Sequence, residues 1–139
     1  MTKVVRDTQA MLAGMTPILT DGEFVFCTTK DSGLMERAML MALGSFKEAE
    51  GMTLILARSE AKLLGFVDAL PMRRITLEVF SSLDGVGLTA AVAAALAAEG
   101  IPCNMVAAYH HDHAFVPAAM AERAIAVLQE LQKRSLRAG

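Results

Sequence analysis

The sequence predicts an α/β protein in which antiparallel strands are covered by helices on one face. Three observations lead to this prediction. The chain has 139 residues, of which 54% are hydrophobic, enough for one or two small domains that share a core. Its apolar residues recur with a period of two in some segments and of three to four in others. Turn signals such as Asp21-Gly22 and Leu70-Pro71 separate these segments.

The first half of the chain contains two strand patterns among short helical ones. Alternation and apolar runs predict strands at residues 23–29 and 52–58. Helical spacing predicts helices at 3–15, 31–45 and 59–64, and Pro17 is expected to end the first of them. Because Pro71 disfavours a helix at Leu70, the chain is expected to divide there into residues 1–70 and 71–139.

The second half reads strand, helix, strand, strand, helix. Strands are expected at 74–80, 101–109 and 114–116, helices at 88–99 and 118–133, and a turn at 110–113. Two short strand–helix–strand halves, with a hairpin in the second, favour the ferredoxin-like arrangement. The second half lacks the last strand of that arrangement, which a strand of the first half or of another chain could supply.

Residues 81–90, SSLDGVGLTA, form a glycine-spaced turn between a predicted strand and a predicted helix. The pattern Gly85-x-Gly87-x-x-Ala90 matches the loose dinucleotide-binding fingerprint. A dinucleotide site is not expected, because the strand after the helix turns back within a few residues. That strand also ends without the acidic residue that would meet the ribose.

The same turn has two simpler interpretations. Ser81, Ser82 and Asp84 could cap the helix through local hydrogen bonds. Alternatively, the N–H groups from Gly85 to Leu88 could hold a small carboxylate at the helix N-terminus. The residues alone leave both open.

Several phrases of the sequence resemble a known family. The phrases are EAEGMTL at 48–54, SSLDGVGLTA at 81–90, CN at 103–104 and HDHAFVP at 111–117. Over about residues 24–131 they resemble the ACT-domain family, in particular small stand-alone bacterial ACT-like proteins of unassigned function. The resemblance implies two ACT-like halves built from βαββαβ units. Such units pair side by side, bind amino acids or similar ligands at the first turn, and regulate an enzyme. Here the regulated partner is expected to be a separate protein.

On this resemblance we expect a ligand site that joins the glycine turn to the segments after the helix. The backbone N–H groups of the turn would hold the carboxylate, Asn104 a polar group, and the histidine segment would close the rim. The expected ligand-binding residues are Ser81, Ser82, Leu83, Gly85, Val86, Gly87, Leu88, Asn104, His111, Asp112 and His113.

All three histidines lie within His110–His113. In a strand, His111 and His113 would point to the same side and could clamp a metal, with Asp112 adding an oxygen. In a hairpin turn, the same residues would only shape the backbone. No further Cys or carboxylate is obviously aimed at the segment, so no metal or other cofactor is expected, and metal binding stays an alternative.

Catalysis has little support in the sequence. Ser82 or Cys103 could be combined with His111 and Asp112, but no nucleophile elbow of the form G-x-S-x-G is present. The chain is therefore not expected to be an enzyme. A purely structural dimerisation module remains the third alternative.

Composition excludes other classes of partner. The net charge of −2 lacks the basic surface that nucleic acids need. No stretch could span a bilayer, and the N-terminus does not resemble a signal peptide, so a cytoplasmic protein is expected. Cys27 and Cys103 are then expected to be buried thiols. The apolar surplus could cover a subunit interface, and we expect a homodimer.

Overall fold

The computed structural model describes residues 8–78 and 87–138. It divides the chain into two compact units, which are described separately. Unit 1 comprises Met1–Asp21 and Arg73–Gly139, and unit 2 comprises Gly22–Met72. The border between them therefore falls inside one strand, β5 (Met72–Leu77), close to the turn signal at Leu70-Pro71.

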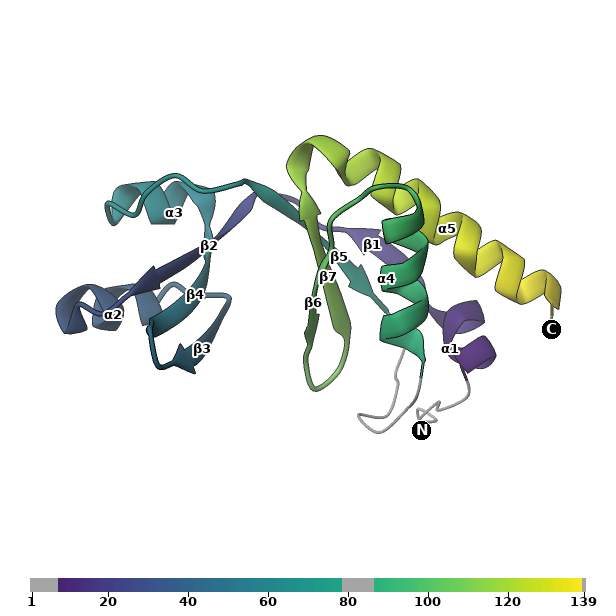
Figure 1. Ribbon diagram of the computed structural model, residues 1–139, viewed down its shortest axis with the longest axis horizontal. Helices are drawn as coiled ribbons and strands as arrows, with labels where there is room; N and C mark the ends of the chain where they lie inside the picture. The colour runs from purple at the N-terminus through teal and green to yellow at the C-terminus, as the bar shows by residue number, and fades with distance from the viewer. Residues whose placement is uncertain (1–7, 79–86, 139) are drawn as a thin grey trace. The chain divides into compact units, whose positions relative to one another are not determined.

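Unit 2 is an antiparallel sheet with two helices (Figure 1). Its elements are β2 (Phe24–Thr29), α2 (Ser32–Met39), β3 (Gly44–Glu48), β4 (Gly51–Ala57) and α3 (Arg58–Leu63). Strand β4 lies between β3 and β2 and is antiparallel to both. Met72, at the start of β5, pairs with Phe24 on the other side of β2. The resulting order, β3-β4-β2-β5, is that of a ferredoxin-like sheet.

The core of unit 2 follows from the alternation of its strands. Val25 and Cys27 of β2 and Leu54 and Leu56 of β4 point to the same face and are buried with Ala38 and Ala61 of the two helices. Helix α2 begins where the Asp31 carboxylate accepts a hydrogen bond of 2.8 Å from the Leu34 N–H.

Unit 1 consists of strands with the described helices packed on one face of them (Figure 1). Its elements are α1 (Thr8–Gly14), β1 (Pro17–Leu19), β5, α4 (Leu88–Ala98), β6 (Asn104–Ala107), β7 (Asp112–Pro117), the 3₁₀ turn η1 (Ala118–Met120) and α5 (Ala121–Ala138). The strand order is β1-β5-β7-β6. The hydrophobic core lies between this sheet and the helices, and it includes Ile75, Leu77, Val92, Leu96 and Leu128.

The predicted fold class, an α/β protein with two ferredoxin-like halves, is confirmed. The missing strand of the second half is also found, because β1 pairs antiparallel with β5 from Pro17↔Leu77 to Leu19↔Ile75. Strand β7 lies between β5 and β6, so the strand after α4 is not the neighbour of the strand before it. That order differs from the parallel crossover of a dinucleotide fold.

The compact units differ from the predicted halves 1–70 and 71–139. Residues 8–21 belong to the same compact unit as the second half of the chain. The physical reason is that Met11, Leu12 and Met15 enter the core of unit 1, while β1 completes its sheet. A cut at residue 70 alone would separate α1 and β1 from the core in which they are buried.

Two strands were missed, and several boundaries differ. Pro17 begins β1 instead of merely ending a helix, and the helix predicted at 31–45 ends at Met39, with β3 beginning at Gly44. The helix predicted at 59–64 begins one residue earlier, at Arg58, with Ala57 as its N-cap residue. The strand predicted at 101–109 is confined to Asn104–Ala107, and the predicted turn at 110–113 is wrong in its second part, because β7 begins at Asp112.

The two cysteines are both free thiols. Cys27 is buried, as expected, whereas Cys103 is only half-buried just before β6. Burial raises the pKa of both thiols, which lowers their reactivity as nucleophiles.

Candidate functional site

Helix α4 begins at a glycine in the left-handed conformation. Gly87 is its N-cap residue, with a left-handed φ of 103°, and its carbonyl accepts the first helical hydrogen bond from the Ala91 N–H at 2.9 Å. Gly87 has no side chain with which to cap this helix. The first N–H groups of a helix have no acceptor within it and carry a partial positive charge. This end of α4 is therefore suited to a small anion.

Helix α1 packs closely against the start of α4. A Cβ atom added to Gly87 would lie 2.5 Å from Thr8 Oγ1 and 2.9 Å from Thr8 Cγ2. Two constraints thus require glycine at position 87: the left-handed backbone, and the side chain of Thr8. The Thr8 hydroxyl is brought next to the helix start as a result.

Only some of the expected turn residues lie within the described part of the chain. Ser81, Ser82, Leu83, Gly85 and Val86 lie outside the described residues. Leu88 is described, and its side chain is buried in the core of unit 1, so only its backbone is available at the helix start.

The histidine segment lies at the same end of unit 1 as the start of α4, because the hairpin between β6 and β7 points that way (Figure 1). The Ala108 N–H donates to the His111 carbonyl at 3.1 Å and closes the turn. The Nδ1 atom of His111 is buried and has no hydrogen-bond partner among the described residues. The His110 ring packs edge-on against Tyr109, with centroids 5.0 Å apart.

His113 and Asp112 lie on opposite faces of β7. His113 Nδ1 and Thr76 Oγ1 are 3.0 Å apart, on the face that the helices do not cover. Burial lowers the pKa of His113, and the nearby positive charges of Arg74 and His111 lower it further. Asp112 pairs in register with Ala107, and burial raises the pKa of its carboxyl group against the opposing effect of His111.

Asn104 is not brought to the same place. It begins β6, directly after the segment that follows the C-terminal end of α4. The hairpin turn lies beyond Ala107, three residues and about 10 Å further along the strand. The structure therefore groups Gly87, Leu88, His111 and Asp112 at one end of unit 1, with Asn104 towards the other.

The metal alternative requires ligands that converge. Within residues 8–78 and 87–138, no group of three or more His, Cys, Asp and Glu side chains is placed to hold a metal ion. His113 is engaged with Thr76, and Asp112 faces the other side of the strand.

Three residues near this site were not expected from the sequence. Thr8 lies against Gly87, while Thr76 and Arg74 lie beside His113. Thr76 gives a weak signal, as a polar residue within an alternating strand pattern. Thr8 gives none, since its contact depends on how α1 packs.

Comparison with family models places the chain among known domains. A model of the ACT domain matches residues 4–73, and a second ACT-domain model matches residues 71–130. The search of curated proteins finds no significant match. No helix in the described ranges combines the length and hydropathy of a membrane-spanning segment.

Solved structures with a similar fold include proteins from three bacteria. A protein of unknown function from Vibrio cholerae, described as a possible transport protein, is 39% identical, with a TM-score of 0.80 over 89% of this chain and 94% of that one. The regulatory subunit of aspartate kinase from Thermus thermophilus, in its ligand-free form, is 11% identical, with a TM-score of 0.63 over 84% and 98%. A protein from Agrobacterium tumefaciens is 11% identical, with a TM-score of 0.62 over 85% and 89%.

Proposed function

The chain belongs to the ACT-domain family, and we propose that it is a regulatory module that binds an amino acid and acts on a separate partner protein. Small-ligand binding and regulation are general properties of ACT domains, and catalysis is not. The amino acid, the separate partner, a cytoplasmic location and a homodimeric state are the specific parts of the proposal. Two unpaired thiols fit a reducing compartment.

The observation that carries the proposal is the glycine N-cap at the start of α4. An amino acid offers a carboxylate, which helix N–H groups bind well, and an ammonium group, which needs polar acceptors nearby. Gly87 places no side chain of its own over the helix start, and the Thr8 side chain borders it. His111 adds, at the same end of unit 1, a buried ring nitrogen that has no hydrogen-bond partner among the described residues. A compact zwitterion suits such a site better than a large cofactor does.

The likeness to the aspartate kinase regulatory subunit is consistent with a regulatory role but does not identify a ligand. That protein is 11% identical to this chain, so the likeness shows the fold. The proposed ligand class follows instead from the family and from the chemistry at the start of α4.

A thermal-shift panel of the standard amino acids tests the proposal. A ligand that binds only the native state at 100 times its Kd stabilises the protein by about 2.7 kcal/mol. We expect one or a few amino acids to raise the melting temperature of the wild type. Gly87→Ala should abolish the response, because a Cβ there meets Thr8 and disturbs the helix start.

Gly100→Ala is the matched control. Gly100 follows the other end of α4 and also has a positive φ, of 70°. Among the described residues, no atom lies within 4 Å of a Cβ added to it. The control should therefore keep the wild-type response. A flat panel, or a Gly87→Ala variant that responds as the wild type does, would contradict the proposed site. A flat panel would favour the structural alternative.

A further inference from the structure

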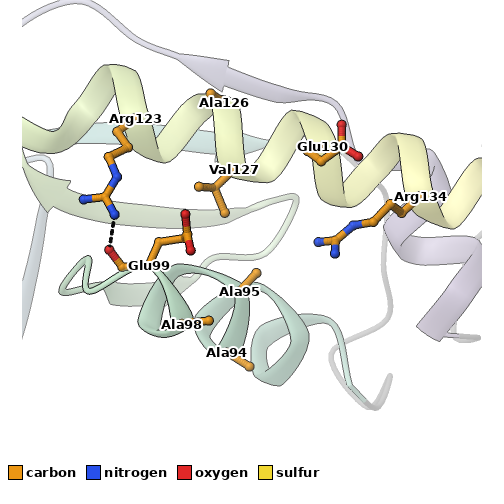
Figure 2. A pocket seen from close by; sticks show the side chains of 9 residues that line it. All are labelled: Ala94, Ala95, Ala98, Glu99, Arg123, Ala126, Val127, Glu130 and Arg134. Atoms are coloured by element: carbon orange, nitrogen blue, oxygen red, sulfur yellow. Dashed lines mark hydrogen bonds between the residues drawn. The ribbon is translucent and has the colours of Figure 1, made fainter.

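A groove of about 720 Å³ runs between α4 and α5 of unit 1 (Figure 2). It is lined by the C-terminal part of α4, whereas the proposed ligand site lies at the start of that helix. Its floor is formed by small side chains, including Ala94 and Ala98 of α4 and Ala126 and Val127 of α5. Charged residues stand at both ends. Because these side chains are small, another helix could approach the floor closely.

The composition of α4 indicates that this surface is covered. Its sequence, LTAAVAAALAA, contains no charged residue. Leu88, Val92 and Leu96 face the core of unit 1, whereas Ala94 and Ala98 on the outer side are exposed. A helix that is apolar on all sides is typical of a buried position. In contrast, α5 carries charged residues along its exposed face.

The charged residues at the two ends of the groove are arranged so that they could pair with the same residues of a second copy. Glu99 and Arg123 lie together at one end, where Arg123 Nη2 donates to the Glu99 carbonyl at 2.5 Å (Figure 2). Glu130 and Arg134 lie further along α5, so the two ends carry one acidic and one basic residue each. Glu130 and Arg123 are equally far from the midpoint between Ala126 and Val127.

We propose that a second copy of this chain occupies the groove, related by a two-fold axis that passes between Ala126 and Val127. The two α5 helices then run antiparallel, and each Arg123 stands level with the partner's Glu130, about 5 Å along the helix from the axis. The partner's Arg134 lies at the end of the groove that holds Glu99. The two-fold axis therefore brings each of these basic side chains close to an acidic side chain of the other copy.

Glu130 already forms an ion pair within its own chain, but that pair is weak enough for Glu130 to pair with Arg123 of the second copy instead. Glu130 accepts a bond of 3.1 Å from Arg137, and both side chains are more than half exposed. Exposed pairs of this kind contribute little stability. Across an interface, in contrast, like charges are strongly unfavourable, so Arg123 and Glu130 set which surfaces can pair.

Charge reversal tests this geometry on the full-length chain, with mass measured by size exclusion and light scattering. R123E places two acidic residues opposite each other in a self-pair, and E130R places two basic ones. Each variant alone should weaken association by more than about tenfold and halve the mass. An equimolar mixture of R123E and E130R should associate again, as should the double variant R123E/E130R.

K133E is the matched control for R123E, because it makes the same change of charge at an exposed α5 residue that does not line the groove. It should keep the wild-type mass, and all variants should unfold at similar temperatures. A monomeric wild type would overturn the proposal. So would single variants that keep the wild-type mass, or a mixture of R123E and E130R that fails to associate. None of these outcomes depends on whether an amino acid binds at Gly87.

Discussion

The close approach of α1 to the start of α4 predicts a large difference between two glycine-to-alanine substitutions. Both Gly87 and Gly100 have left-handed backbones, which cost a residue with a Cβ about 1–2 kcal/mol. At Gly100 nothing more is added, since its Cβ would meet open space. At Gly87 the Cβ would come within 2.5 Å of Thr8 Oγ1, so the Thr8 side chain or the helix must move. Overpacking of this kind costs a further ~1–3 kcal/mol.

These energies convert to measurable melting temperatures. An unfolding entropy of about 2.1 cal/mol/K per residue gives about 0.3 kcal/mol/K for this chain, or roughly 3–4 °C per kcal/mol. Gly100→Ala should therefore lower the melting temperature by about 3–7 °C, and Gly87→Ala by about 7–17 °C. Calorimetry or circular dichroism measures both shifts.

A double-mutant cycle isolates the contact itself. Thr8→Ala removes the two closest atoms and leaves only Cβ, which would lie 3.3 Å from the added carbon. In that background the excess cost of Gly87→Ala should fall by at least about 1 kcal/mol, while the cost of Gly100→Ala should not change. Equal shifts for the two glycine variants, with no coupling to Thr8, would refute the close packing of α1 against the start of α4.

Two further predictions concern the sheet and the core of unit 1. Because the pKa of His113 is lowered in the native state, the unfolded chain binds a proton at a higher pH, so stability should fall as the pH drops below the ordinary value of 6.5. His113→Gln should show a weaker loss in urea titrations over that range, and equal pH profiles would contradict the burial of His113. Leu96 is fully buried, so Leu96→Ala should cost about 2–5 kcal/mol in urea unfolding. Ala90→Ser, on the exposed side of the same helix, should change stability by less than about 0.5 kcal/mol, and similar values for both would argue against the orientation of α4.

The strands that could be predicted from the sequence are those with a buried side. Strands β2 and β4 carry alternating or continuous apolar residues because one face of each enters the core of unit 2. Strand β3 has no such pattern, since almost all of it is exposed and its pairing with β4 holds it in place. Strand β1 has only three residues, too few for any period to be recognised.

The part of the candidate site that depends only on neighbouring residues in the sequence could be predicted. The glycine pattern correctly placed the start of a helix at Leu88, because a left-handed N-cap position favours glycine. The contact with Thr8 joins residues 79 positions apart and depends on tertiary packing alone. The orientation of His113 was missed because a turn was expected where β7 had already begun, and strand parity sends neighbouring side chains to opposite faces.

Helix α4 connects the two proposals physically. Its first residue follows Gly87, where the amino acid is proposed to bind, and its outer alanines line the groove, where a second copy is proposed to dock. A ligand that orders the start of α4 changes the surface offered to the partner only if the helix moves as a rigid body. If it does, linkage requires that dimerisation change the affinity for the amino acid by the same factor by which the amino acid changes the affinity for the partner. E130R, which lies outside the ligand site, separates the cases: an unchanged amino-acid affinity in this monomeric variant would mean that α4 carries two independent sites.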